Sequence, residues 1–134
     1  MLDIEGTDPV PETSVPASES SARPGIDVSI LVVSYNTREM TLECLRSIAS
    51  ETLDHSYEVL VVDNDSSDGS YEAMKREFGD TPGFDIRFSA ENLGFAGANN
   101  HLALDARGDY ILLLNPDTVV LERAIDRLID FAIE

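Results

Sequence analysis

The sequence predicts an α/β fold with a Rossmann-like, mostly parallel sheet flanked by helices, and two observations predict it. Short runs of β-branched and aliphatic residues, typical of strands buried on both faces, alternate strictly with segments of helical period. Each apolar run also ends abruptly in polar residues, as strands do where their carboxyl ends face a ligand. Alternating strands and helices of this length form a parallel sheet that the helices cover.

Four segments have the composition of strands. Residues 28–34, 58–62 and 110–114 consist largely of aliphatic residues and predict strands that are buried on both faces. Residues 84–89 alternate between apolar and polar side chains, which places the three apolar residues of this strand on one face.

Four further segments show the apolar spacing of three and four residues that is typical of amphipathic helices. They are residues 38–51, 71–78, 95–107 and 121–132. Gly79 and Gly108 follow the second and third of these segments, where each glycine predicts the end of a helix. The last pattern continues to the end of the sequence, so we expect a fold that is truncated at its C-terminus.

The chain of 134 residues has room for one domain. Its first 25 residues are rich in Pro, Ser, Glu and Thr and lack a hydrophobic period. Such a segment cannot bury enough apolar surface to offset the entropy that it loses on ordering. We therefore expect residues 1–25 to form a disordered acidic arm and residues 26–134 to fold.

The net charge of −17 argues against one class of partner, because a surface this negative repels the phosphate backbone of nucleic acids. No apolar run is long enough to span a membrane, and the N-terminus lacks the pattern of a signal peptide. The single cysteine, Cys44, falls within a helical pattern, where we expect it to pack in the core. These features predict a cytoplasmic protein.

Polar residues follow all four predicted strands, over residues 34–36, 63–65, 89–92 and 115–117. The carboxyl ends of parallel strands meet at one edge of a sheet, so these residues are expected to lie close together. One polar strand end alone would be ordinary loop chemistry. Four of them favour a polar cleft that binds a ligand.

Two strand ends carry candidate binding carboxylates. Asp63 directly follows a buried strand, and its carboxylate can accept hydrogen bonds from a base N–H group or from ribose hydroxyls. Asn115-Pro-Asp117 offers the oxygen ligands that a hard cation prefers, while substrate phosphates and water complete the coordination. Each has a structural alternative, since Asp63 can cap the next helix and Asn-Pro-Asp-Thr can form a polar turn. Asp68 is assigned to the turn and helix start that follow.

Residues 92–100 read Asn-Leu-Gly-Phe-Ala-Gly-Ala-Asn-Asn. Gly94 and Gly97 allow a ligand to approach the backbone closely, and the helix that follows offers N–H groups to an anion. The segment matches neither the dinucleotide-binding glycine motif nor a P-loop. Asn99 and Asn100 have a structural alternative, which is to satisfy the local backbone at the start of the helix.

In order and spacing, these motifs resemble the successive motifs of family-2 glycosyltransferases. They are Val-Val-Ser34-Tyr35-Asn36, Val-Val-Asp63-Asn64 with residues 66–70, residues 92–100, and Leu-Leu-Asn115-Pro-Asp117. The resemblance covers about residues 27–134. It implies the GT-A fold of nucleotide-diphospho-sugar transferases and an enzyme that transfers a sugar from such a donor to a saccharide or lipid-linked acceptor.

The resemblance also implies roles for single residues. The residues implied to bind the nucleotide are Ser34, Asn36, Asp63, Asn64, Asn92, Gly94, Gly97 and Asn115. Asn115 replaces the first carboxylate of the family's Asp-x-Asp motif, so Asp117 is the implied direct ligand of a divalent metal, Mg²⁺ or Mn²⁺.

Three departures from the family's pattern carry a finer resemblance. Asn115 is the first, Asp65 stands where glycine is frequent, and Asn99 stands where arginine is frequent. These variants resemble the rhamnosyltransferase-like branch, which builds cell-surface polysaccharide. They favour dTDP-rhamnose as the donor.

No catalytic base is assigned, because inverting members of the family take that Asp or Glu from the part that follows the metal motif. We therefore expect the chain to bind the donor without being competent alone, and the full-length protein to work at the inner face of the membrane. Two alternatives remain. One is a non-catalytic module that binds a nucleotide-sugar. The other is a phospho-acceptor signalling domain, although that fold needs a lysine at a late strand end and the single lysine, Lys75, falls in a helix.

Overall fold

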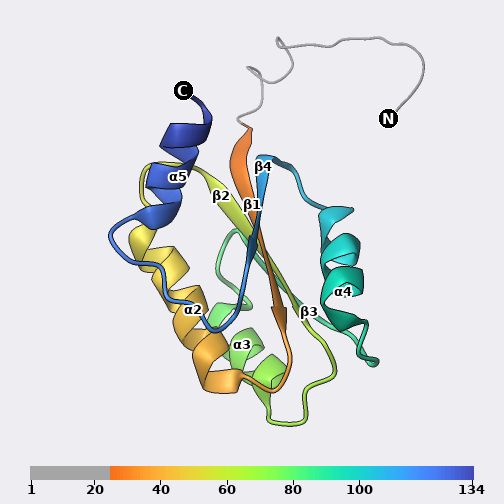
Figure 1. The fold of residues 1–134 in the computed structure, drawn as a ribbon. Helices are drawn as coiled ribbons and strands as arrows, with labels where there is room; N and C mark the ends of the chain where they lie inside the picture. Colours follow the sequence, from red (N-terminus) through yellow and green to blue (C-terminus); the bar gives the residue numbers. More distant parts are fainter. Residues whose placement is uncertain (1–24) are drawn as a thin grey trace, which may run out of the picture.

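The computed structural model describes residues 25–134, which contain one sheet of four parallel strands (Figure 1). The arm expected over residues 1–25 lies outside this part, except for its last residue. The strands are β1 (Ile26–Ser34), β2 (Tyr57–Asp63), β3 (Phe84–Phe88) and β4 (Gly108–Leu114). Their order across the sheet is β3-β2-β1-β4, so the parallel sheet predicted from the alternating pattern is confirmed.

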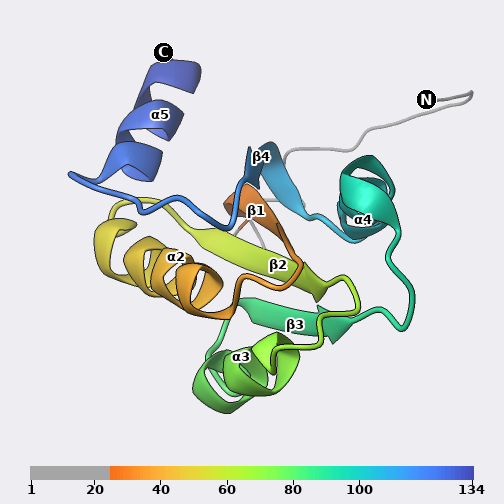
Figure 2. The same ribbon diagram turned by 60° about the horizontal axis from the view of Figure 1, so that its bottom comes forward.

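Helices cover both faces of the sheet. They are α2 (Arg38–Glu51), α3 (Ser70–Phe78), α4 (Gly94–Ala103) and α5 (Ala124–Ala132). Figures 1 and 2 show α2, α3 and α5 on one side of the sheet and α4 on the other. None of these described helices is long and apolar enough to cross a membrane.

The direction in which the sheet grows reverses at β1. The chain first adds β2 and β3 on one side of β1, with α2 and α3 as connections, and then returns through α4 to add β4 on the other side. The carboxyl ends of β1 and β4 therefore flank a topological switch point, which is where open α/β sheets bind their ligands.

The core forms two layers because successive strand residues point to opposite faces of the sheet. On one face, Val28, Ile30 and Val32 of β1 pack with apolar residues of α2, α3 and α5. On the other face, Leu31 and Val33 of β1 pack with the apolar residues of α4. Cys44 is fully buried in the first layer, as its helical position predicted.

Two sequence predictions about β4 were wrong. The helix expected over residues 95–107 ends at Ala103, and Gly108 begins β4 instead of ending a helix. The strand is also not buried on both faces. It lies at the edge of the sheet, and Ile111 and Leu113, on the same face of the sheet as α4, are each 52% exposed because α4 does not cover them. An aliphatic run predicts burial, but the run alone does not say whether a neighbouring element provides it.

Gly108 is required by close packing between β4 and β1. A Cβ atom at this position would lie 2.5 Å from the backbone nitrogen of Ser29 and 2.7 Å from the carbonyl carbon of Val28. Both contacts are with backbone, which cannot move aside without breaking the pairing of β1 and β4. The position therefore excludes every other residue.

We expect Gly108→Ala to lower the free energy of unfolding by about 2 kcal/mol, since overpacking forces the two strands apart. Gly97→Ala is the matched control. Gly97 lies inside α4, where a Cβ atom would meet only Leu93 Cβ at 3.6 Å, so alanine should raise stability by up to about 1 kcal/mol through helix propensity. Urea unfolding of both variants checks this, and equal effects at the two glycines would contradict the packing argument.

Candidate functional site

The parallel register brings the four polar segments to one edge of the sheet. Ser34 pairs with Asp63, and Asp63 pairs with Phe88, so β1, β2 and β3 end in one row. On the other side of β1, Leu114 pairs with Val32, and the chain leaves β4 through Asn115 at the same edge. The convergence predicted from the polar strand ends is therefore present.

Asp63 is a fully buried carboxylate at the end of β2. One carboxylate oxygen accepts the backbone N–H of Ser66 at 2.9 Å, and the other accepts the Ser66 hydroxyl at 2.6 Å. Burial raises the pKa of Asp63 above its ordinary value, the hydrogen bonds from Ser66 oppose this rise, and the negative charges of Asp68 and Glu72 add to it. Asp63 thus holds the loop after β2, and this loop covers its carboxylate.

The loop after β1 is bound to the loop after β2. Asn36 adopts a left-handed backbone with φ 51°, its N–H donates to Ser66 Oγ at 2.7 Å, and its Oδ1 accepts the N–H of Ser67 at 2.8 Å. Ser34 is buried, and its hydroxyl lies 3.1 Å from that of Thr41 on α2. The two loops therefore form one hydrogen-bonded rim beside the switch point, in which Asn36 and Ser67 are exposed.

Asp68 has the structural role that its turn position predicted. Its Oδ2 accepts the N–H of Arg38 at the start of α2, and its Oδ1 accepts the N–H of Ser70 at the start of α3. One carboxylate therefore satisfies free N–H groups at the beginnings of two helices.

Asn64 connects the end of β2 to the start of α4. Its Oδ1 accepts the N–H of Leu93 at 2.9 Å, and its Nδ2 donates to Asn92 Oδ1 at 2.9 Å and to the carbonyl of Gly94 at 3.4 Å. Gly94 has φ +76°, a conformation that favours glycine, and with this residue the chain turns into α4. The first turn of α4 thus lies at the carboxyl edge of the sheet, with Asn92, Gly94 and Gly97 exposed.

The segment after β4 is a turn with an exposed carboxylate. The carbonyl of Asn115 accepts the N–H of Thr118 at 3.3 Å and its hydroxyl at 2.7 Å. Asn-Pro-Asp-Thr is therefore a polar turn, which was the structural alternative, but the turn leaves the side chains of Asn115 and Asp117 exposed. Within residues 25–134, no group of three His, Cys, Asp or Glu side chains is placed to hold a metal unaided.

The sequence model of the family described as Glycosyl transferase family 2 matches residues 29–134, which is most of the chain. The chain belongs to glycosyltransferase family 2. Among curated relatives, the poly(ribitol-phosphate) β-glucosyltransferase of Bacillus spizizenii is 28% identical over 109 residues, covering 80% of this chain and 17% of that protein. The chain spans 17 to 42% of the length of the first three curated relatives that it matches.

Solved structures show the same GT-A fold. TarS of S. aureus in complex with UDP-GlcNAc superposes with a TM-score of 0.70 at 21% identity, over 81% of this chain and 31% of that chain. The mannosyltransferase PcManGT of Pyrobaculum calidifontis, in complex with GDP-Man and Mn²⁺, superposes with a TM-score of 0.68 at 26% identity, over 86% of this chain and 36% of that chain. The expected GT-A fold, with its mostly parallel sheet and flanking helices, is therefore confirmed.

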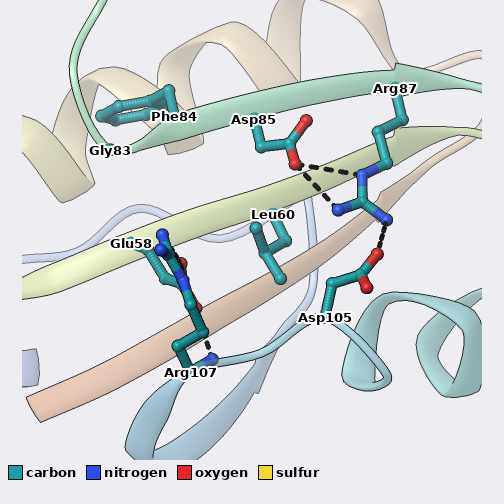
Figure 3. A pocket seen from close by; sticks show the side chains of 8 residues that line it. All are labelled: Glu58, Leu60, Gly83, Phe84, Asp85, Arg87, Asp105 and Arg107. Carbon is teal, nitrogen blue, oxygen red and sulfur yellow. Dashed lines mark hydrogen bonds and ion pairs between the residues drawn. The ribbon is translucent and has the colours of Figure 1, made fainter. Parts of the chain in front are cut away.

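The described part of the domain also has a hollow that the sequence did not predict. It lies on the α4 side of the sheet toward the amino ends of β2 and β3 (Figure 3). Arg87 lies between Asp85 and Asp105 at 2.8 Å from each, and Arg107 pairs with Glu58 at 3.0 Å. Both arginines are thus paired with acids of the hollow, which leaves little positive charge for a phosphate. In the sequence, the one indication of this hollow is Glu58, an acidic residue at the start of an aliphatic strand.

Proposed function

We propose that this chain is the donor-binding part of a glycosyltransferase that takes a sugar from a nucleotide-diphosphate donor and transfers it to a saccharide or lipid-linked acceptor. One observation carries the proposal: the four family motifs leave the sheet at one edge, around the switch point between β1 and β4. Family membership and the nucleotide-sugar complexes of TarS and PcManGT support it.

The proposed nucleoside side of the site is the rim formed by Ser34, Asn36 and Asp63. Asn36 is exposed and available to a ligand, whereas the carboxylate of Asp63 lies beneath Ser66. A base or ribose therefore reaches Asp63 only if the Ser66 loop shifts. The diphosphate is proposed to lie along Asn92, Gly94 and Gly97, where the first turn of α4 presents backbone N–H groups.

The residues after β4 fit a divalent cation that shares its ligands with the substrate. Asp117 offers an exposed carboxylate with no hydrogen bond to another described residue, and Asn115 offers an amide oxygen that acts through ribose or water. Mg²⁺ and Mn²⁺ are commonly held by one or two carboxylates together with phosphate oxygens and water. When bound, such an ion would neutralise charge on the departing diphosphate.

The proposed reaction is an inverting single displacement in which an acceptor hydroxyl attacks the sugar. The chain is proposed to lack the general base for this step, so it should bind a nucleotide-sugar without transferring the sugar. We place the full-length protein in cell-surface polysaccharide synthesis, at the cytoplasmic face of the membrane. The B. spizizenii glucosyltransferase, named for poly(ribitol-phosphate), supports that context.

The donor is proposed to be dTDP-rhamnose, from the variants Asp65, Asn99 and Asn115. Thymine and uracil share their hydrogen-bonding edge and differ by one methyl group, whose burial contributes up to about 0.8 kcal/mol, or severalfold in affinity. Competition among dTDP, UDP and GDP for the Mn²⁺-loaded domain tests this. We expect dTDP to equal or modestly exceed UDP, with GDP weakest. A clear preference for GDP would remove the rhamnosyl assignment and leave the family assignment intact.

A further inference from the structure

We infer that Asn64 is a positioning residue, whose carboxamide fixes the Asn92–Gly94 backbone against the end of β2, and that it acts on the nucleotide through this loop without touching it. This inference rests on the proposed function. It changes the role that the family resemblance implied for Asn64, because the resemblance implied that Asn64 binds the nucleotide.

The hydrogen bonds of Asn64 leave little for a ligand. Both N–H groups of Nδ2 are used, one toward Asn92 Oδ1 at 2.9 Å and one toward the Gly94 carbonyl at 3.4 Å. Oδ1 accepts the N–H of Leu93 at 2.9 Å. The residue is 2% exposed, so the remaining lone pair of Oδ1 does not face solvent.

The orientation of the carboxamide follows from its partners. The backbone nitrogen of Leu93 can only donate, and the carbonyl of Gly94 can only accept. A flipped carboxamide would place donor against donor and acceptor against acceptor. The arrangement with Oδ1 toward Leu93 is therefore the one that satisfies both backbone groups.

Asn92 extends the contact to the first turn of α4. Its Oδ1 accepts the N–H of Gly94 at 2.8 Å as well as the Nδ2 of Asn64. Asn64 also donates its backbone N–H to the carbonyl of Ser34 at 2.8 Å, so the same residue is tied to the end of β1. These hydrogen bonds fix the positions of the end of β1, the end of β2 and the start of α4 relative to one another. They therefore set the direction in which the free N–H groups of α4 point.

Two variants separate positioning from direct contact. Asn64→Asp keeps the size and the acceptor oxygen of the side chain but places a second oxygen against Asn92 Oδ1 and the Gly94 carbonyl. Asn92→Ala removes the oxygen that accepts from Asn64 Nδ2 and from the N–H of Gly94. Asn92 is exposed, so the fold is expected to tolerate this substitution. Asn100→Asp is the control for an added negative charge, because Asn100 is exposed and lies outside this network, farther along α4.

The first measurement is amide hydrogen exchange in the absence of nucleotide. We expect the N–H groups of Leu93 and Gly94 to be protected in the wild type and in Asn100→Asp. They should exchange faster in Asn64→Asp, because the second oxygen repels Asn92 Oδ1 and the Gly94 carbonyl and displaces the loop. In Asn92→Ala, Gly94 should lose protection while Leu93 retains it. Unchanged protection of Leu93 in Asn64→Asp would overturn the inference, and it would do so whether or not the chain binds a nucleotide.

The second measurement is the affinity for UDP in the presence of Mn²⁺. We expect each single variant to bind UDP about tenfold more weakly than the wild type. The double variant should bind UDP no more weakly than the worse single variant, because both substitutions break the same contact between Asn64 and Asn92. Losses that multiply in the double variant would mean that Asn64 and Asn92 affect the nucleotide separately, which would contradict the inference. A loss in Asn64→Asp with Leu93 still protected would mean that Asn64 touches the nucleotide itself. A wild type that does not bind UDP would instead remove the proposed function, while the exchange result would still decide the role of Asn64 in the loop.

Discussion

Asp117→Ala is expected to abolish the mutual enhancement between Mn²⁺ and UDP. In the wild type, we expect saturating Mn²⁺ to raise the affinity for UDP at least about tenfold, since the metal neutralises the diphosphate while a carboxylate holds it. Asp117 supplies the one carboxylate at the turn after β4, and its side chain is exposed. Without it, the affinity for UDP should fall to its metal-free value and no further.

Asp109→Ala is the matched control for Asp117→Ala. Asp109 is also an exposed aspartate of the β4 region, but it lies near the start of the strand, at the opposite edge of the sheet. Its removal changes the net charge equally and should leave the enhancement by Mn²⁺ intact. Calorimetric titration of UDP with and without Mn²⁺ measures all three proteins, and equal enhancement in Asp117→Ala and the wild type would remove the metal role from Asp117.

Asp126→Ala is expected to lower the free energy of unfolding by about 3 kcal/mol at pH 7. Asp126 lies in α5, is 1% exposed and accepts three consecutive backbone N–H groups from the segment that connects α2 to β2. The distances are 2.7 Å to Leu53, 3.0 Å to Asp54 and 3.1 Å to His55. Alanine would leave all three donors without this acceptor, and α5 would lose three hydrogen bonds to the segment that connects α2 to β2.

The loss caused by Asp126→Ala should depend on pH. Burial alone would raise the pKa of Asp126, but the N–H groups of Leu53 and Asp54, together with Arg123, outweigh it and hold the pKa below its ordinary value. A folded-state pKa below the unfolded value stabilises the fold fully above pH about 4, and the contribution is lost as the pH falls through the folded-state pKa. The difference between wild type and variant should therefore shrink at pH 3.

Asp130→Ala is the control for Asp126→Ala. Asp130 lies on the same helix with a largely exposed side chain, and its carboxylate accepts one hydrogen bond, from the ring Nε2 of His55 at 2.8 Å. Hydrogen bonds with Asp130 and Asp27 raise the pKa of His55, so the protonated ring stabilises the fold below its unfolded-state pKa of about 6.5, and this contribution is lost as the pH rises through the folded-state pKa. Urea unfolding at pH 7 and pH 3 should give a much smaller effect for Asp130→Ala at pH 7. Equal losses for the two variants at pH 7 would contradict the role of Asp126.

The sheet could be predicted from the sequence because local composition decides where strands begin and end. The strands starting near residues 28, 58 and 84 lie where their aliphatic or alternating patterns placed them. Gly108 shows the limit of this reasoning. A glycine after a helical pattern predicts a helix end, but here the glycine is required by the backbone of Ser29, a contact between residues far apart in the sequence.

The candidate site was predictable in its position but not in its hydrogen bonds. Strand ends and motif order brought Asp63, Asn64 and Asp117 to one edge, since parallel pairing leaves no alternative. Whether a polar side chain is free or already bonded depends on loops packed from other strands. Asn64 and Asp117 have similar sequence contexts, yet Asn64 is bonded to Leu93 while Asp117 is exposed. Likewise His55 follows no sequence motif, yet its ring is held between Asp27 and Asp130.

The central claim is that the carboxyl edge of the sheet binds a nucleoside diphosphate. Titration of UDP with Mg²⁺ into the ¹⁵N-labelled chain, followed by amide chemical shifts, tests it most directly. The account predicts saturable shifts concentrated in residues 34–36, 63–67, 92–97 and 115–118, with Glu58, Arg87 and Arg107 of the opposite hollow unaffected. Shifts confined to that hollow, or no shifts at millimolar UDP, would contradict it.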